Sequence, residues 1–251
     1  MSAQGSVIKT ARRIFEVLEY FDEVQQPTSL KEMSVHFGYP VSSASVLLKS
    51  MVVMGYLDYD SYSRTYMPTM RVAMLGNWVQ GALFGESRIL ALMKHMSDET
   101  GETISLGTQS DLLAQYIHVV PSQYAIRYHL KSGAVRPLAR SGIGCLLLSA
   151  RTDETIDRLL RRINIEEEPD ARIALPDLMQ RIREIREQGY VFSRNTLVDG
   201  IGLIGMLLPI RRHGRILAIG VGGPLDRLDK KKDKILKELR EGIARFVERG
   251  E

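Results

Sequence analysis

The sequence is poor in cysteine and in long apolar runs, and each scarcity excludes a class of protein. Cys145 is the single cysteine among 251 residues, which excludes an internal disulfide framework and a cysteine-based zinc site. No apolar run approaches the ~20 residues that a membrane-spanning helix needs. The N-terminal stretch MSAQGSVIKTARR lacks the uncharged apolar segment of a secretory signal. We therefore expect a cytoplasmic protein that does not associate with membranes.

An excess of positive charge is also missing from the N-terminal part of the chain. The whole chain has a formal net charge of +4, which favours a nucleic-acid partner. In residues 1–80, however, seven lysines and arginines are balanced by seven aspartates and glutamates. A DNA-binding site in this region would therefore depend on where single charges are placed. The length and the 44% of hydrophobic residues are typical of two modest globular domains.

Three helices are predicted at the start of the chain. Apolar residues at helical spacing predict the first over residues 7–22. A short second helix follows, with Thr28 or Ser29 as its N-cap and Gly38 at its end. Pro40 suits the first turn of the third helix, which follows at once. The short connection between the last two helices is typical of a helix-turn-helix.

Two short aromatic segments, YLDYD and RTYMP, flank a polar turn after the third helix and predict a β-hairpin. Tyr62 and Tyr66 are expected to pack this hairpin. A helix-turn-helix followed by a hairpin is a winged helix-turn-helix, which we assign to residues 1–68. A linker helix is predicted over residues 69–84, where apolar residues again recur at helical spacing.

The third helix has one apolar face and one small, mostly polar face. Ser42, Val46 and Lys49 lie on the polar face, which would enter the major groove of DNA, with the hairpin beside it. The alternative is a helical packing domain whose serine face is only solvated. Lys49 suits a phosphate or a guanine, and the serines suit phosphates or base edges. The candidate DNA-binding residues are Ser42, Ser43, Ser45, Val46, Lys49 and, at the tip of the wing, Arg64.

Residues 85–251 show a different pattern, in which predicted strands and helices are mixed. A helix ends at Gly101, and two alternating segments, GETISLGTQSDLLAQYIHVVP and YAIRYHLKSGAVRPL, predict strands. SGIGCLLLSA predicts a buried helix, and two charged amphipathic helices follow it. Three more strands and a closing helix over 226–248 complete the pattern. The fold class is therefore α+β, with an α/β sensor domain at the C-terminal end.

These segments together resemble the IclR family of bacterial transcriptional regulators over nearly the whole chain. The matching segments are residues 6–18, SLKEMSVHFGYPVSSASVLLKSMVVMGYL, ETGETISL, YIHVV, PLARSGIGCLLLSA, IREQGYVFS and GRILAIGVGGPLDR. The resemblance implies a winged helix-turn-helix joined by a helix to a GAF-like effector-binding domain. It also implies a homodimer or homotetramer that binds a double-stranded DNA operator and responds to a small organic acid.

The chain departs from the family's pattern at informative positions. The recognition helix often carries an arginine where this sequence has Val46, whose only specific contact with a base would be to a thymine methyl. The sensor helix often reads Gly-Lys where this sequence has Gly144-Cys145. Family members can present an acid and a cysteine at the positions of Ser193 and Leu203. The weakly polar and apolar pair found here indicates a larger or less polar effector.

The SGIG turn predicts an effector site. Its residues are too small to block a ligand, and the N–H groups and dipole at a helix start favour a carboxylate. The resemblance places this turn on the effector pocket, opposite residues 193–203. Arg136 would bind the carboxylate, or else form a surface ion pair; Ile201 and Leu203 would line the pocket, or else belong to the core. The candidate effector-binding residues are Tyr128, Arg136, Gly142, Ile143, Gly144, Ser193, Ile201 and Leu203.

Two other classes of function compete with this interpretation. Cys145 with His118 or His129 would make a thiol–imidazole pair, but a cysteine inside an apolar helix is usually inert. The histidines have no metal-ligand spacing, and the glycine-rich GIGLIG and GVGGP lie in strands. We therefore expect no enzyme activity, no metal and no cofactor. The second alternative is a small-molecule-binding protein with a degenerate DNA-binding domain, which the neutral N-terminal region and Val46 keep open.

Overall fold

The computed structural model describes residues 8–76, 88–212 and 214–247, and the chain divides into two compact units, Met1–Gly81 and Ala82–Glu251. Each unit has its own buried apolar core, and we describe each by itself. Within the described ranges, no helix combines the length and the apolar character that crossing a membrane would require.

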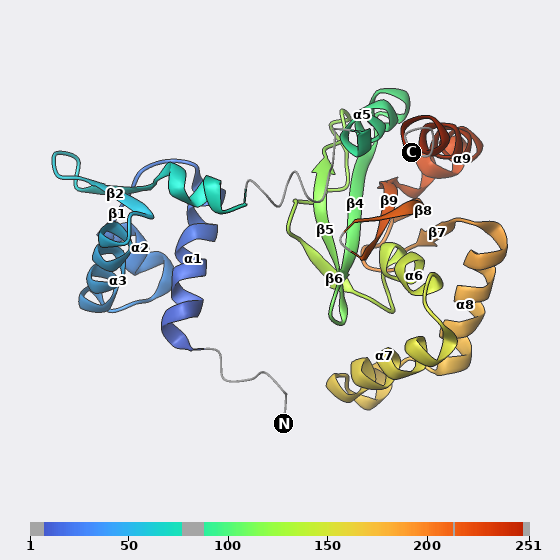
Figure 1. Cartoon of the computed structure of the whole chain (residues 1–251), viewed down its shortest axis with the longest axis horizontal. Helices are drawn as coiled ribbons and strands as arrows, with labels where there is room; N and C mark the ends of the chain where they lie inside the picture. The colour runs from blue at the N-terminus through green and yellow to red at the C-terminus, as the bar shows by residue number, and fades with distance from the viewer. Residues whose placement is uncertain (1–7, 77–87, 213, 248–251) are drawn as a thin grey trace. The chain divides into compact units, whose positions relative to one another are not determined.

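The N-terminal unit has helices on a small antiparallel sheet of strand order β1-β3-β2 (Figure 1). Its elements are α1 (Lys9–Val24), β1 (Thr28–Ser29), α2 (Leu30–Phe37), α3 (Val41–Val53), β2 (Leu57–Asp60) and β3 (Thr65–Pro68). The predicted three helices and hairpin are confirmed, and β1 is an addition that pairs with β3. Residues 70–76 are helical, whereas the rest of the predicted linker helix lies outside the described residues.

Local polar contacts set where α2 begins. Ser29 is its N-cap: the Ser29 hydroxyl accepts a hydrogen bond from the Glu32 amide, and the Glu32 carboxylate accepts one from the Ser29 amide at 2.7 Å. These two bonds form a capping box, which satisfies backbone donors that a helix start leaves open. The hydrogen bonds that the Ser29 amide and then the Ser29 hydroxyl donate to the Glu32 carboxylate lower the pKa of Glu32.

The turn between α2 and α3 is held by Gly38 and Tyr39. Gly38 has φ +65°, a left-handed conformation that glycine adopts at low cost. The Ser34 hydroxyl donates to the Tyr39 carbonyl at 2.7 Å, and the Tyr39 hydroxyl donates to the Glu16 carboxylate. Burial, followed by Glu16, raises the pKa of Tyr39 to about 12. These contacts fix the angle of α3 against α1 through side chains from three elements.

The C-terminal unit is a six-stranded antiparallel sheet of order β6-β5-β4-β9-β8-β7 with helices on both faces (Figure 1). One buried cluster joins α5 and α9 to the sheet, and the other joins α6, α7 and α8 to it. The helices are α5 (Arg88–Thr100), α6 (Gly142–Ser149), α7 (Asp153–Glu166), α8 (Leu175–Gln188) and α9 (Leu225–Phe246), with a 3₁₀ turn at Pro169–Ala171. The strands are β4 (Thr103–Ser110), β5 (Leu113–Val120), β6 (Val135–Pro137), β7 (Val191–Arg194), β8 (Ile201–Arg212) and β9 (Arg215–Pro224).

One predicted strand segment is mostly wrong. Residues 121–134 form no strand, and only the three residues of β6 pair with β5. The loop is instead fixed by single contacts, such as the Thr103 hydroxyl donating to the Tyr128 carbonyl at 3.0 Å. Alternating apolar residues give a segment the surface of a strand, but they do not supply a partner for its backbone.

A buried ion network fastens α9 to the start of β4. Glu102 is 0% exposed and accepts two hydrogen bonds of 2.8 Å from the Arg227 guanidinium. Lys231, one turn further along α9, reaches the same carboxylate at 3.3 Å. A fully buried carboxylate is tolerated when it is paired and hydrogen-bonded in this way.

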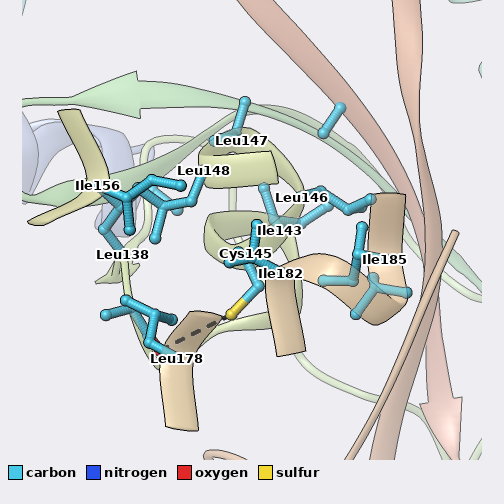
Figure 2. Close-up of a cluster of buried hydrophobic side chains, with 14 of the residues drawn as sticks. Leu138, Ile143, Cys145, Leu146, Leu147, Leu148, Ile156, Leu178, Ile182 and Ile185 are labelled. Carbon is cyan, nitrogen blue, oxygen red and sulfur yellow. Dashed lines mark hydrogen bonds between the residues drawn. The ribbon is translucent and has the colours of Figure 1, made fainter. Parts of the chain in front are cut away.

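Helix α6 lies inside its cluster, packed against β8, β9 and α8. Figure 2 shows Cys145 among leucine and isoleucine side chains, with its sulfur directed away from the helix. The Cys145 thiol donates to the Ala139 carbonyl, with the sulfur 3.7 Å from the oxygen. Burial raises the pKa of this thiol to about 11.

Candidate functional site

The outward face of α3 is small and mostly polar. Ser42, Val46 and Lys49 are exposed on it, and the exposed Val53 continues the same stripe one turn later. Val46 is 67% exposed, although it is apolar. Ser43 and Ser45 are half-buried at the sides of the helix. The opposite face is closed by buried Ala44, Leu47, Leu48 and Met51, so the helix presents only this stripe to a partner.

Arg64 lies at the end of the turn between β2 and β3, which is the tip of the wing. Its φ of +55° is left-handed, a conformation in which arginine is uncommon. Asp60 organises the turn by accepting hydrogen bonds from the Tyr62 amide and the Ser63 hydroxyl. The prediction that Tyr62 packs the wing is wrong: it is 98% exposed, because a turn this short offers nothing to bury it. Tyr66 is buried, and its ring lies 4.8 Å from that of Tyr59.

The charges on this surface are available for a partner. Neither Lys49 nor Arg64 forms an ion pair with another described residue of the chain. An exposed cation without an acidic neighbour keeps its full attraction for a phosphate. The outer face of α3 and the tip of the wing therefore offer one cation each, together with hydroxyl groups.

Five of the eight candidate effector residues line one small pocket in the C-terminal unit. They are Tyr128, Gly142, Ser193, Ile201 and Leu203. The pocket has a volume of about 30 Å³, far below the ~300 Å³ at which ordinary small-molecule sites begin. Sequence reasoning missed the other lining residues, which are Tyr116, Thr196, Leu197, Val198 and Gly202. Only the range 193–203, taken from the resemblance, held a signal for four of these, and Tyr116 had none because it reads as an ordinary strand residue.

Gly142 opens α6 against strands β7 and β8. A Cβ atom on Gly142 would lie 2.7 Å from the Ser193 hydroxyl and 3.2 Å from a Leu203 methyl, so only glycine leaves this space open. Ser141 caps the helix, and its hydroxyl accepts from the Gly144 amide at 3.1 Å. Within the described residues, the amides of Gly142 and Ile143 have no hydrogen-bond partner. Gly142 lines the pocket, so its amide is the donor that the start of α6 offers there, and the Ile143 amide follows it in the same turn.

Three predicted effector residues are not among the lining residues. Ile143 is fully buried and packs on Gly107 and Gly220, which makes it a core residue. Gly144 lies against the Leu138 carbonyl, which a Cβ atom would approach to 2.0 Å, so it is needed for close packing. Arg136 donates to the Tyr128 hydroxyl at 3.4 Å and to the Val135 carbonyl at 3.0 Å. Arg136 therefore contacts Tyr128, a lining residue, without lining the pocket itself.

Burial changes the pKa of both the thiol and one of the imidazoles that were considered for catalysis. The Cys145 thiol donates to a backbone carbonyl, and its raised pKa keeps it protonated at neutral pH. Burial lowers the pKa of His118. No three histidine, cysteine, aspartate or glutamate side chains of the described ranges gather in a way that would hold a metal ion.

Comparisons with known proteins give one family for both units. The family profile "Bacterial transcriptional regulator IclR C-terminal" matches residues 87–247, and "IclR helix-turn-helix domain" matches residues 10–61. Among curated proteins, the HTH-type transcriptional regulator XynR of Escherichia coli K12 is 23% identical over 214 residues, which is 84% of each chain. The transcriptional repressor IclR of the same strain is 24% identical over 236 residues, covering 88% of this chain and 82% of that protein.

Solved structures agree. The effector domain assigned to the transcriptional regulator IclR of Acinetobacter sp. ADP1 is 37% identical, with a TM-score of 0.61 over 66% of this chain and 97% of that one. IclR of Thermotoga maritima has the same fold, with a TM-score of 0.71 over 94% of this chain and 97% of that one, at 18% identity. With a matching profile on each unit, the chain belongs to the IclR family of bacterial transcriptional regulators, with an N-terminal DNA-binding helix-turn-helix domain and a C-terminal α/β domain.

Proposed function

We propose that the chain is a ligand-responsive regulator that binds a pseudo-palindromic operator as a homodimer or homotetramer. Residues 1–68 would bind DNA, 69–84 would link the domains, and 85–251 would bind the effector. The protein would act in the cytoplasm, where bacterial DNA lies. The observation that carries this proposal is the outer stripe of α3. It exposes serine hydroxyls and the Lys49 cation, while the opposite, apolar face of the helix is buried.

The chemistry of the surface fits a DNA groove. The face made by Ser42, Val46 and Lys49 would enter the major groove, with Ser43 and Ser45 near the phosphates at its edges. Arg64 would lie beside it, where a narrow minor groove attracts a cation. The left-handed backbone at Arg64 supports a role in binding, because strain of this kind persists where a side chain has to be aimed.

The effector we propose is a small organic carboxylate with an apolar or aromatic body. The free amides of Gly142 and Ile143 would bind the carboxylate, and Tyr128, Ile201 and Leu203 would contact the body. Because the pocket has a volume of only about 30 Å³, an acid of this kind has to enlarge it. Leu197 and Val198 are exposed in the turn before β8, so moving that turn exposes little new apolar surface.

The test of the DNA-binding role is fluorescence anisotropy of the full chain with labelled DNA from directly upstream of its own gene. Lys49→Ala and Arg64→Gly should each weaken binding and reduce the slope of log K against log salt by about 1, because each removes one phosphate contact. Arg64→Gly should also leave thermal stability unchanged or higher, since glycine relieves the left-handed backbone.

The control is Arg158→Ala, which removes an exposed cation on α7 and should change neither value. If the wild type binds this DNA no better than an unrelated fragment, the alternative of a degenerate DNA-binding domain holds. If Arg158→Ala weakens binding as much as Lys49→Ala, the α3 face is not the contact surface.

A further inference from the structure

A second and much larger cavity lies between α6, α8, β7 and α9. Its volume is about 460 Å³, within the range of small-molecule sites. Its lining residues are Arg140, Gly142, Cys145, Arg181, Glu184, Ile185, Gln188, Tyr190, Val191, Phe192, Ser193, Arg194, Thr196 and Lys232. All of them belong to the C-terminal unit, and α8, β7 and α9 each supply a cation.

The charge of this lining is positive. Four cations line it, against the single carboxylate of Glu184. Two of the four are already paired: Arg194 binds Asp229 at 2.8 Å, and the Arg140 side chain lies 4.0 Å from the Glu167 carboxylate and donates to the Ala171 carbonyl. The pairs leave a net positive lining even when Asp229 and Glu167 are counted with it.

The remaining two cations, Arg181 on α8 and Lys232 on α9, form no direct salt bridge with another described residue, although Lys232 helps Arg194 to lower the pKa of Asp229. Both are half-buried, and the Lys232 ammonium lies over the face of the Tyr190 ring, 5.6 Å from its centroid. Glu184, one turn from Arg181, accepts a hydrogen bond from Gln180. A half-buried cation without a direct ion pair has lost part of its hydration, so charged hydrogen bonds to an anion placed between the two would compensate for the lost hydration.

We propose that this cavity is a second ligand site, distinct from the small pocket, and that it takes a small organic anion with two or more negative charges. One anionic group would pair with the fork of Arg181 and another with Lys232, because the two cations come from different helices. The site shares Gly142, Ser193 and Thr196 with the small pocket. An anion bound here therefore alters the affinity of the small pocket for its own ligand, and the effect is reciprocal.

The test is isothermal titration of the full chain with citrate and with inorganic pyrophosphate, and with acetate as the monoanion. Wild type should bind both polyanions more tightly than acetate. Arg181→Ala and Lys232→Ala should each weaken citrate binding about tenfold, as expected for the loss of one charged contact. Arg181→Lys should recover part of the loss, since it keeps the charge without the planar fork.

Two matched variants distinguish binding in this cavity from binding elsewhere on the unit. Arg183→Ala removes an exposed arginine of the same helix that is outside the cavity, and Ile201→Ala changes a residue of the small pocket alone. Both should bind citrate as wild type does, and melting curves should show that every variant folds. A loss in Arg183→Ala equal to that in Arg181→Ala means general attraction to a basic surface and overturns the proposal. Failure of both polyanions to bind at millimolar concentration, or equal binding of acetate, overturns it as well.

Discussion

At the scale of single residues, Gly142 lies where two cavities of the C-terminal unit meet, and its lack of a side chain leaves the space there open. It borders the small pocket and the larger cavity, with Ser193 opposite it. Arg136, for which the sequence left carboxylate binding or a surface ion pair open, contacts Tyr128 and the backbone. The proposed carboxylate contacts are thus backbone amides, which cannot be removed by truncating a side chain but can be covered by adding one.

This arrangement makes a prediction for the effector. Gly142→Ala should abolish the binding of benzoate, used as a probe acid, because the new methyl group would point at the Ser193 hydroxyl and Leu203 and fill the pocket. Arg136→Ala should change the affinity only about two- to threefold, the effect of loosening Tyr128 (about 0.5 kcal/mol). Calorimetric titration of the full-length variants measures both. Loss of binding in Arg136→Ala alone would restore the arginine as the carboxylate ligand.

At the scale of elements, the helix-turn-helix depends on short-range polar contacts that place α2 and α3. Ser29 begins α2, Gly38 ends it, and Ser34 binds the backbone of the turn that follows. None of these contacts involves the outer face of α3. The stability of the motif and its affinity for DNA are therefore set by different residues, and substitutions should separate them.

Ser29→Ala tests this separation. Loss of the Ser29 hydroxyl cap should lower the free energy of unfolding of the N-terminal unit by about 1 kcal/mol. Ser42→Ala, an exposed serine on α3, should leave stability unchanged or slightly raise it, since alanine favours a helix. Chemical denaturation followed by circular dichroism measures both. Equal losses in the two variants would mean that the cap does not hold α2.

The capping box also has a predictable response to pH. The Ser29 amide and hydroxyl lower the pKa of Glu32. The ionised carboxylate therefore stabilises the fold above its usual pKa, and this contribution is lost as the pH falls through the lowered value. In Ser29→Ala, part of that acid sensitivity should already be absent.

Sequence patterns predicted those elements whose signals are local. Ser29, Gly38 and the apolar stripe of α3 each act within a few residues, and the structure confirms their roles. Residues 124–134 looked like part of a strand because alternation is local, whereas a strand also needs a distant partner. The lining of the larger cavity was not predicted from the sequence for a similar reason. Arg181 and Lys232 read as solvated charges of amphipathic helices, and only the packing of α8 and α9 around β7 brings them to one space.

At the scale of the whole molecule, one recognition helix per chain sets the expected assembly on DNA. A single helix reads only a few base pairs, so a specific site requires two half-sites one helical turn or a multiple of it apart. Among the described residues, the outer face of α3 and the tip of the wing bring two cations to this surface, Lys49 and Arg64. High specificity would then come from symmetry, and only a small part of the affinity from phosphate contacts.

We therefore expect a dimer, or a dimer of dimers, on a pseudo-palindrome, with a shallow dependence of affinity on salt. Analytical ultracentrifugation of the complex gives the number of chains, and anisotropy over a salt series gives the slope. A single chain on an asymmetric site would contradict the expectation. So would a slope that corresponds to about ten or more phosphate contacts.

The pairing of β4 with β9 has a consequence for how the protein is made. Thr103 pairs with Gly222, so the middle of the large sheet joins the two ends of its unit. Closing so long a loop is slow, and it cannot begin until β9 has left the ribosome. The N-terminal unit needs no residue of this sheet and can fold much earlier in synthesis. During every round of translation, the N-terminal DNA-binding unit would then be folded for some seconds before the C-terminal unit.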